Sequence, residues 1–454
     1  MTDPVKPAAR PDRVSLWRYL RLFRQDILSA QPARLYRAWM AEFRTPFFTS
    51  YLANDPALID RVLKERPDDF PKSDRIGEGL RPLLGNSVFL TNGATWKRQR
   101  RIIDPAFAGG RLRETFPAMQ EAAQAAVARL APLADGRPRD IEPETSHAAA
   151  DVIFRTLFSR TIEDRDAAEV FEAFRDYQRS QPILNLAALV PGPRWMPRLF
   201  RPQTRATARR IRTLIARLTD QRQSEIDAGT APDDLASKIM TTVDPQDSKP
   251  FAPGEMVDQV AIFFLAGHET SAAALGWTLY LLAHAPDVQD RCAAEAMAWQ
   301  GTFADLSRLR LTRDSFREAL RLYPPVPMMV RQTTQPERLR DRLAPTGAQI
   351  VLSPWHLHRH ERLWSTPDAF DPDRWQREES AEARRKAYLP FSAGPRVCTG
   401  AGFAMLEGVT LLAHLLRAYR FELVAERPPV PVAHLTVRTR HGMWLRLYPR
   451  SASA

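Results

Sequence analysis

The chain has 454 residues, 44% hydrophobic and 26% charged, which is enough apolar material for a large globular core and excludes collagen, coiled coil and wholesale disorder. Its formal charge of +12 is spread along the chain without a nucleic-acid-binding motif, so we expect no nucleic-acid partner. Two cysteines, Cys292 and Cys398, exclude a disulfide scaffold and a four-cysteine zinc site. With no signal peptide, we expect a cytoplasmic protein.

Helical periodicity predicts a mostly α fold with small β-sheets, in one domain over residues 13–454 that follows a Pro-rich, disordered segment over residues 1–12. Strands are expected over 47–52, 349–353 and 433–447. The expected helices, in chain order, span 32–44, 56–65 (capped by Asp55), 94–103, 110–132, 144–160, 167–180, 203–228, 232–241, 254–285, 287–299, 312–323 and 399–417.

Residues 182–202 carry several prolines, which bar a continuous helix, together with side chains too apolar for a fully exposed loop. We expect this stretch to form a mobile lid over a substrate entrance, with a static packed connection as the alternative.

The longest apolar stretch lies mid-chain, from Val257 to Ala285, and has Gly267, His268 and Glu269 near its centre. A charge at the middle of a bilayer costs about 2.5–3.5 kcal/mol on insertion scales, so a buried central helix is favoured over a membrane span. No transmembrane anchor is expected.

The sequence Phe391-Ser-Ala-Gly-Pro-Arg-Val-Cys-Thr-Gly400 leads into an apolar helix. A lone cysteine is more often a small buried hydrophobe than a ligand. At a helix N-terminus, however, backbone N–H groups lower the pKa of Cys398 and favour the thiolate. Gly394 permits a tight turn, Gly400 allows a flat ligand to approach, Arg396 can bind an anion, and Phe391 can shield the sulfur.

This segment resembles the haem-thiolate loop of the cytochrome P450 superfamily, in its soluble bacterial type. The resemblance, supported by three further motifs in the family's order, covers about residues 35–447. It implies haem b between the long central helix and the cysteine-loop helix, with Cys398 as the ligand of the iron.

The first further motif is Glu318-Ala-Leu-Arg321, followed by Phe370-Asp-Pro-Asp-Arg-Trp375. By itself a Glu/Arg pair three residues apart on a helix indicates a minor surface ion pair. The resemblance implies instead a buried structural network of Glu318, Arg321 and Arg374 that holds the cysteine loop.

The second is Ala266-Gly-His-Glu-Thr270 in the central helix. A threonine here could simply bond back to a backbone carbonyl. The resemblance implies an acid–alcohol pair beside an oxygen-binding groove, in which Gly267 makes room, Thr270 donates a hydrogen bond and Glu269 relays protons.

The third is Trp96-Lys-Arg-Gln-Arg100, whose first and last residues share a helix face. The resemblance implies that Trp96, Arg100, Arg331 and Arg396 bind the haem propionates, which suits the bidentate geometry of arginine. His356, His358 and His360 alternate as metal ligands can, but no carboxylate or cysteine completes a site there, and we expect no metal.

The chemistry implied is the insertion of one oxygen atom from O2 into a hydrophobic small molecule such as a fatty acid, terpene, steroid or aromatic, because a thiolate ligand favours O–O cleavage. Electrons are expected from a separate ferredoxin or flavodoxin with its reductase, and so from NAD(P)H only indirectly. Family topology suggests as pocket residues Leu83, Val88, Phe89, Phe263, Ala266, Val326, Met328, Met329 and Leu435.

A peroxide-driven peroxygenase and a non-enzymatic haem sensor remain as alternatives, and Glu269 with Thr270 argues against both. The electron donor is expected to dock on a basic face, since complementary charge accelerates association. That face is expected to hold Lys97, Arg98, Arg101, Arg384, Arg385 and Lys386.

Overall fold

The computed structural model describes residues 3–44, 48–180, 202–433 and 435–450. Its helices are α1 (Leu16–Gln25), α2 (Pro56–Asp60), α3 (Asp74–Leu84), α4 (Gly93–Ile103), α5 (Gly109–Leu130), α6 (Glu142–Phe158), α7 (Arg165–Ser180), α9 (Pro202–Asp227), α10 (Leu235–Thr241), α11 (Pro253–His284), α12 (Pro286–Ala298), α13 (Arg310–Leu322), α14 (Pro354–Leu357), α15 (Ala381–Ala387) and α16 (Ala401–Ala418). The expected lid over 182–202 lies outside the described residues, except for Pro202 at the start of α9.

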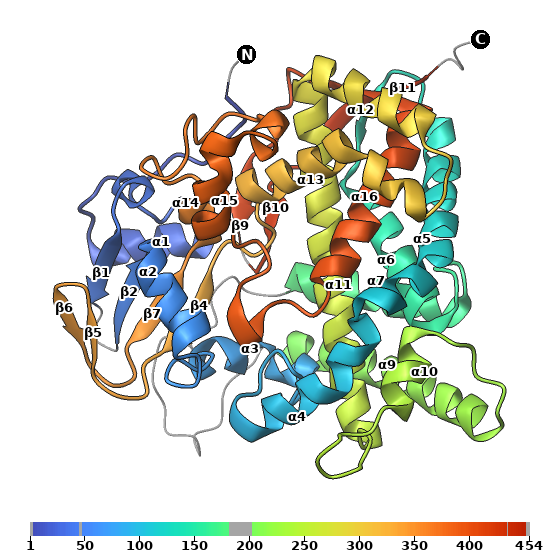
Figure 1. Ribbon diagram of the computed structural model, residues 1–454, viewed down its shortest axis with the longest axis horizontal. Helices are drawn as coiled ribbons and strands as arrows, with labels where there is room; N and C mark the ends of the chain where they lie inside the picture. The colour runs from blue at the N-terminus through green and yellow to red at the C-terminus, as the bar shows by residue number, and fades with distance from the viewer. Residues whose placement is uncertain (1–2, 45–47, 181–201, 434, 451–454) are drawn as a thin grey trace.

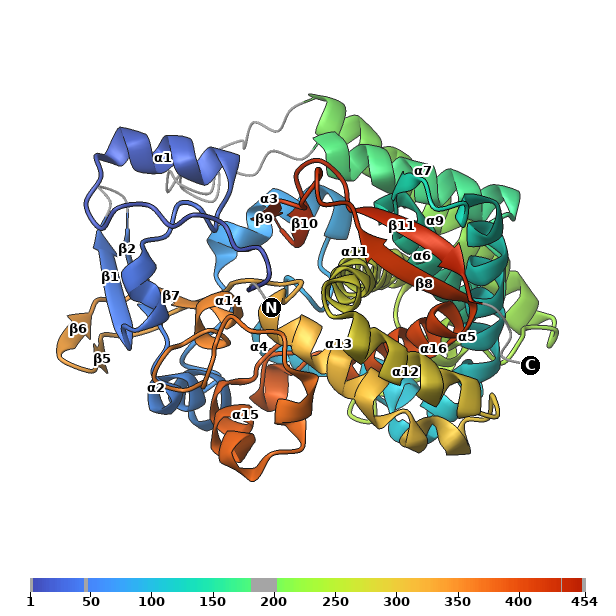
Figure 2. The ribbon, with the colours of Figure 1, turned by 90° about the horizontal axis from the view of Figure 1, so that it is seen from above.

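The long helix α11 runs through the middle of the helical half of the molecule, and most of its side chains are buried (Figures 1 and 2). Pro253 occupies its first turn, where a missing N–H costs nothing, and Glu255 accepts a hydrogen bond from the N–H of Ala252 at 2.9 Å. The apolar run from Val257 to Ala285 therefore forms a buried core helix, as its sequence predicts.

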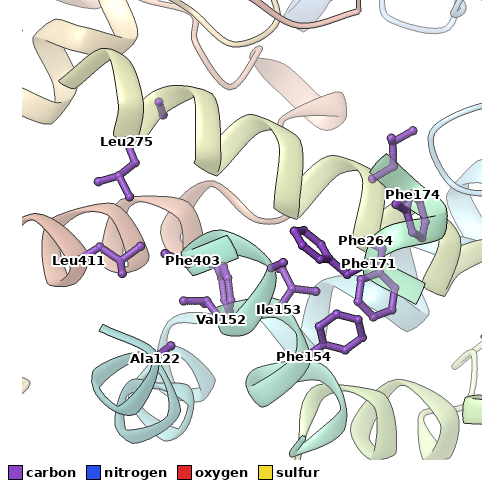
Figure 3. Packing of buried hydrophobic residues seen from close by; sticks show 14 of the residues in the cluster. Ala122, Val152, Ile153, Phe154, Phe171, Phe174, Phe264, Leu275, Phe403 and Leu411 are labelled. Carbon is purple, nitrogen blue, oxygen red and sulfur yellow. The ribbon is translucent and has the colours of Figure 1, made fainter. Parts of the chain in front are cut away.

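Aromatic side chains fix the position of α11 against α6 and α7. The Phe264 ring lies 4.6 Å from Phe154 and 5.9 Å from Phe174, and Figure 3 shows these rings gathered at one end of the packed core. Leu275 of α11 and Leu411 of α16 belong to the same hydrophobic cluster further along the helix. Burying one such side chain contributes about 1.5–3 kcal/mol.

The strands form small sheets at the edge of the helical core. A four-stranded sheet has the order β1-β2-β7-β4, with β2 and β7 parallel, and the antiparallel sheet β3-β11-β8 contacts α11 through β8. The pairs β9/β10 and β5/β6 complete the set. The strands are β1 (Met40–Arg44), β2 (Thr49–Ala53), β3 (Pro138–Asp140), β4 (Met329–Gln332), β5 (Glu337–Leu339), β6 (Arg342–Ala344), β7 (Gln349–Leu352), β8 (Tyr419–Leu423), β9 (Pro431–Ala433), β10 (Val437–Thr439) and β11 (Trp444–Pro449).

One predicted element is wrong in kind and another in its continuity. The helix expected over 32–44 is a short 3-10 turn, Ala33–Tyr36, followed by β1, because Ala41 and Leu35 bury themselves with Leu52 of the neighbouring strand. The strand expected over 433–447 is broken into the end of β9, β10 and the start of β11, with a turn at Gly442, whose φ of 84° favours glycine.

The segment over residues 1–12, expected to be disordered, makes packing contacts where it is described. The carbonyl of Val5 accepts a hydrogen bond from the Tyr323 hydroxyl at 2.6 Å, and Lys6 pairs with Asp368 at 2.5 Å. Arg10 donates from Nε to the carbonyl of Ala30 at 2.6 Å. These contacts tie the segment to the body of the protein.

Among the described helices, α16 alone has the length and apolarity of a membrane-spanning segment, with a mean hydropathy of 1.2. Of that window 56% is buried within the protein, and the helix packs on α5 and α12. A core helix passes the same test, so this is weak evidence for a membrane span.

Candidate haem site

The cysteine loop approaches the turn at Arg61–Glu65 so closely that only glycine fits at position 394. The φ of Gly394 is 68°, and an added Cβ would lie 2.0 Å from the carbonyl oxygen of Leu63. The N–H of Cys398 donates to the carbonyl of Phe391 at 2.9 Å, which closes the loop. By contrast, a Cβ on Gly400 would meet the Cys398 sulfur at an ordinary 4.0 Å, so the protein itself does not demand glycine there.

The protonation of Cys398 differs from the expectation drawn from its place before a helix. The residue is accessible, but surrounding protein desolvates the sulfur, and this burial raises the pKa of the thiol. The Gly400 N–H and Arg100 act in the opposite direction and do not outweigh it. A thiolate at this position therefore needs a further positive charge, such as a bound metal ion.

Three cations lie over the ring of Trp96, a buried side chain of α4. The guanidinium carbon of Arg396 lies 4.7 Å from the Trp96 ring, and Arg100 and Lys72 are each 5.8 Å away. Arg331 of β4 faces Lys72 through an isolated β-bridge. We call Lys72, Arg100, Arg331 and Arg396 the cationic cluster. Lys72 belongs to no recognised motif and could not be singled out from the sequence.

The cationic cluster is short of anions. Arg100 pairs with Asp104 at 2.8 Å, but the carboxylate found for Arg396, Asp68, is 3.9 Å away and largely exposed. The only side-chain hydrogen bond of Arg331 within the described residues goes to the adjacent Val330 carbonyl, at 3.2 Å.

Buried polar atoms of the cluster lack partners in the described structure, namely Nε of Arg331 and Nε of Arg396. Burial and the neighbouring Arg396 lower the pKa of Arg331 to about 10. Burial, then Arg396, Arg331 and Arg100, also hold the pKa of Lys72 well below its usual range. Unpaired buried cations are costly, so this donor set fits a ligand that carries two carboxylates, as haem does.

On α11, Thr270 and Ala266 lie on the same helix face. Ala266 is exposed and Thr270 half-buried in a helix that is otherwise mostly buried. The Thr270 hydroxyl donates to the carbonyl of Ala266 at 2.5 Å, the local bond that its position also predicted. The hydroxyl oxygen keeps the capacity to accept a hydrogen bond.

Gly267 allows a close contact between two helices. A Cβ there would lie 2.5 Å from Cδ1 of Ile153, so the glycine permits α11 to pack closely on α6. Its expected role beside an oxygen-binding groove stays a prediction.

Glu269 is buried and lines a polar cavity of about 260 Å³, together with His268, Glu142 and Arg438. Its Oε1 atom pairs with Nη2 of Arg438 at 2.6 Å and accepts a hydrogen bond from Thr436. Burial raises the pKa of Glu142, which also lines this cavity. The acid of the expected acid–alcohol pair is thus held by the C-terminal strands, a contact that the sequence did not indicate.

Glu407 of α16 is a second buried acid that the sequence analysis missed. It accepts a hydrogen bond from Ser271 at 2.6 Å, which joins α11 to α16 next to Thr270 in the chain. Burial raises the pKa of Glu407 to about 8, so the side chain is mostly protonated at neutral pH.

The motif residues Glu318, Arg321 and Arg374 come together in a fully buried network, which we call the balanced cluster. Glu318 accepts from Arg321 at 2.8 and 2.9 Å and from Arg374 at 2.8 Å. The remaining guanidinium N–H groups donate to backbone carbonyls, including His358 at 2.8 Å and Ser365 at 2.9 Å. Burial opposes the charge of Glu318, yet the two arginines keep its pKa below the usual range.

His358 connects the balanced cluster to the cysteine loop. Its Nδ1 lies 3.1 Å from the carbonyl of Arg321, and its Nε2 accepts from the N–H of Leu389 at 2.8 Å, two residues before Phe391. These partners require a neutral ring with the proton on Nδ1, and burial lowers the pKa of His358 to about 3. Of its motif neighbours, His356 lies 2.8 Å from the Ser353 hydroxyl and His360 stacks on Trp39 at 4.4 Å.

The pocket expectations meet one correction. Leu83 is fully buried in the main hydrophobic cluster, so it belongs to the core. Phe89 and Leu435 are 42% and 38% exposed. The remaining pocket candidates are all half-buried or exposed, namely Val88, Phe263, Ala266, Val326, Met328 and Met329.

The expected basic face is largely neutralised by acidic partners. Lys97 pairs with Asp68 at 2.8 Å and Arg101 with Asp244 at 2.6 Å. Arg98 pairs with Asp247 and Glu255, and Lys386 with Glu382, while Arg384 donates to carbonyl groups. Of the six, only Arg385 has no hydrogen bond or ion pair within the described residues, although its charge acts on the nearby Glu382.

Comparison with known proteins agrees with this geometry. The family model for Cytochrome P450 matches residues 36–444. Two proteins of Streptomyces melanosporofaciens, a cyclooctat-9-en-7-ol 5-monooxygenase and cyclooctatin synthase, are 33% and 30% identical over 85% and 88% of this chain, and 83% and 84% of their own. A cytokinin hydroxylase of Arabidopsis thaliana is 28% identical over 82% of this chain and 73% of its own.

Among solved structures, the haem domain of cytochrome P450DA superposes with a TM-score of 0.82 over 99% of both chains, at 23% identity, which shows the same fold. With the cysteine loop, the balanced cluster and the cationic cluster all in place, the chain belongs to the cytochrome P450 superfamily.

Proposed function

We propose that this cytochrome P450 monooxygenase binds haem b and oxidises a hydrophobic small molecule with O2, using electrons from a separate donor protein. The observation that carries the proposal is the cationic cluster around Trp96, which leaves buried guanidinium nitrogens without partners beside an accessible Cys398. Cys398 would bind the iron, and Arg331, Arg396, Arg100 and Lys72 would hold the propionates. When bound, haem supplies the oxygen activation, and the protein supplies the thiolate, proton supply and substrate pocket.

For the substrate, we propose an apolar molecule of the terpene class before a fatty acid, steroid or aromatic. Two relatives, at 33% and 30% identity, are named for cyclooctat-9-en-7-ol and cyclooctatin, the first an unsaturated alcohol by its name. The candidate lining residues Phe263, Val326, Met328 and Leu435 are all apolar, which suits such a molecule. A low-spin to high-spin shift on titration with candidate substrates tests this choice.

Proton supply is assigned to Glu269 and Thr270. Glu269 lines the cavity of about 260 Å³ and can exchange a proton at its carboxylate there, while Thr270 presents its hydroxyl on the Ala266 face of α11. Such positioned proton donors contribute about 10²–10⁴-fold to rates. The cytoplasmic location stays a proposal, and the ferredoxin or flavodoxin donor, fed indirectly by NAD(P)H, is what the family resemblance implies.

The test of haem ligation compares two cysteines. Cys398→Ala should abolish the red-shifted Soret band of the ferrous–carbon monoxide complex, whereas Cys292→Ala should keep it. Cys292 is a matched control because it is buried beside Ser315, and burial raises its pKa to about 12. An unchanged spectrum in the Cys398 variant would overturn the proposal.

The test of oxygen chemistry compares two threonines of α11 that make the same local bond. Thr270→Ala should lower product formed per reductant oxidised, while Thr278→Ala should not, because Thr278 donates to Ala274 inside the core. Equal coupling in the parent and the Thr270 variant, with faster product formation from hydrogen peroxide than from O2 and donor, would favour a peroxygenase instead.

A further inference from the structure

Helix α1 presents an unusual outer face. Trp17 is 83% exposed, the highest value among the exposed large hydrophobic side chains of the described residues. The helix begins at a regular N-cap, where the Ser15 hydroxyl accepts from the N–H of Arg18 at 3.3 Å. A tryptophan held in water by a capped helix is a candidate for contact with a partner.

The two faces of α1 differ in composition. Tyr19, Leu20, Leu22 and Phe23 are half-buried on the face toward the protein, where the Tyr19 and Phe23 rings lie 5.7 Å apart. On the outer face, Arg21 and Arg24 follow Trp17 at spacings of four and seven residues, so they lie on the same side of the helix. The exposed Arg18 lies beside them on the same face.

The outer face carries unbalanced positive charge. Arg13, Arg18, Arg21 and Arg24 contribute four cations over residues 13–25, and this range contains no acidic residue. Within the described residues none of the four pairs with a carboxylate, and the undescribed segments contain no Asp or Glu.

The nearest acids in the chain are otherwise engaged. Asp26 accepts hydrogen bonds from the N–H groups of Leu28 and Ala433, and Asp12 lies 4.0 Å from Arg34. The positive potential of the α1 face is therefore open to an external anionic partner.

The helix also adjoins a candidate substrate residue. Ile27, two residues beyond α1, donates from its N–H to the carbonyl of Ala433 at 3.1 Å, and the N–H of Ala433 donates to Asp26 at 2.7 Å. Leu435 follows two residues later. Figure 2 shows α1 at the outer edge of the molecule, on the opposite side from α5 and α16.

We propose that the outer face of α1 docks on an anionic lipid bilayer, with the Trp17 ring among the headgroups and Arg18, Arg21 and Arg24 on lipid phosphates. Tryptophan is enriched at the headgroup level of membranes, and a helix with arginines beside it binds in the plane of the surface. The association is peripheral. It does not depend on the proposed monooxygenase function, although it would place the Leu435 side of the molecule near a reservoir of apolar substrate.

The number of arginines on the outer face of α1 sets the expected change in vesicle binding. One arginine near an anionic surface contributes about fivefold to partitioning, so reversing two of them should weaken binding by more than about 25-fold. Added salt should weaken binding too, because exposed charges are screened over about 8 Å at physiological ionic strength.

The experiment is co-sedimentation of the full-length, haem-loaded protein with vesicles of phosphatidylcholine, alone or mixed with phosphatidylglycerol. The parent should bind the anionic vesicles at low salt, and both Trp17→Ala and the double variant Arg21→Glu/Arg24→Glu should lose most of that binding. Brominated acyl chains should quench more fluorescence in the parent than in Trp17→Phe.

Two control variants make the same kinds of substitution at exposed positions away from α1. Leu343→Ser removes another exposed apolar side chain, 72% exposed, in the β5/β6 hairpin. Arg113→Glu/Arg417→Glu reverses two exposed arginines on α5 and α16, which lie away from α1. Both controls should bind like the parent.

Three results would overturn the proposal: no vesicle binding by the parent, equal binding to uncharged vesicles, or equal loss of binding in the controls. No vesicle binding combined with binding of an acidic protein that requires Arg21 and Arg24 would assign the face to a protein partner instead. The carbon monoxide spectrum of every variant should match the parent, which separates this test from that of the proposed function.

Discussion

The balanced cluster is fully buried, and the cationic cluster is buried at Arg331 and Arg396, yet the two arrange their arginine charges differently. Glu318 supplies a carboxylate to Arg321 and Arg374, and backbone carbonyls take up the remaining guanidinium N–H groups. Arg331 has no carboxylate partner within the described residues and Arg396 has only the exposed Asp68 at 3.9 Å, and each retains a buried Nε without a partner.

The difference indicates what each cluster is for. A charge network completed by the chain itself stabilises the fold with or without a ligand, whereas one short of anions is completed only by a ligand. Variants can therefore separate the stability of the protein from its affinity for haem.

The largest effect is expected for Glu318→Gln. The substitution leaves the buried guanidinium groups of Arg321 and Arg374 without a carboxylate, which should lower the free energy of unfolding by about 3–5 kcal/mol. Urea unfolding of the apoprotein measures it. Glu382→Gln, at an exposed ion pair with Lys386, should change little. Equal stability of the Glu318 variant and the parent would show that the cluster does not hold the fold.

Arg331→Met should have the opposite effect: it should preserve the stability of the apoprotein but weaken haem binding. Replacing a desolvated, unpaired cation by an apolar side chain should leave the apoprotein as stable as the parent or more so. Loss of one charge-assisted hydrogen bond of about 1.5–3 kcal/mol should weaken haem retention by roughly 10–100-fold. The rate of haem transfer to apomyoglobin reports this, with Arg342→Met at the surface as the control. Unchanged transfer would remove Arg331 from the site.

His358→Gln should loosen the connection between the two regions. The variant disrupts the contacts to Arg321 and Leu389, at a cost of about 1–3 kcal/mol. We expect a smaller fraction of the carbon monoxide complex with the thiolate spectrum, and no change in the exposed control His441→Gln.

The pH dependence of His358 has a defined sign. Its folded pKa of about 3 lies below the unfolded value of about 6.5, so the unfolded chain binds the extra proton between these values. Stability is therefore full above about pH 6.5 and falls as the pH drops toward 3. In the Gln variant, the difference in bound protons between the unfolded and folded states should be smaller by up to one in this pH range. An identical pH dependence of the free energy of unfolding in variant and parent would contradict the assignment.

The smallest effect concerns Lys72. Its folded pKa lies well below the unfolded value of about 10.5, so the unfolded apoprotein holds more protons in the range between them, and stability rises with pH there. For one titrating group, the free energy of unfolding changes by at most about 1.4 kcal/mol per pH unit. Lys72→Met should abolish this pH dependence, and haem binding should reduce it in the parent. If parent and variant apoproteins show the same slope, Lys72 is not desolvated.

Local sequence determined the elements whose signals are short-range. The cap at Asp55, the apolar run of α11, and the glycine and cysteine spacing around Cys398 follow from helix start rules and turn geometry, so they could be predicted. The motifs also identified every member of the balanced cluster.

Other features could not be predicted because they depend on residues that are distant in the chain. Only the packed structure brings Lys72 to Arg331 and Trp96, Arg438 to Glu269, and His358 to Leu389. The same holds for the close contact between Gly267 and Ile153 of another helix.

Sequence by itself thus determined the family, most of the local elements and the identity of the candidate haem ligand. Tertiary structure decided which charges are balanced, which carboxylic acids are protonated and which face of α1 remains open. The physical reason is that desolvation and pairing are properties of the surroundings, which sequence neighbours only partly supply.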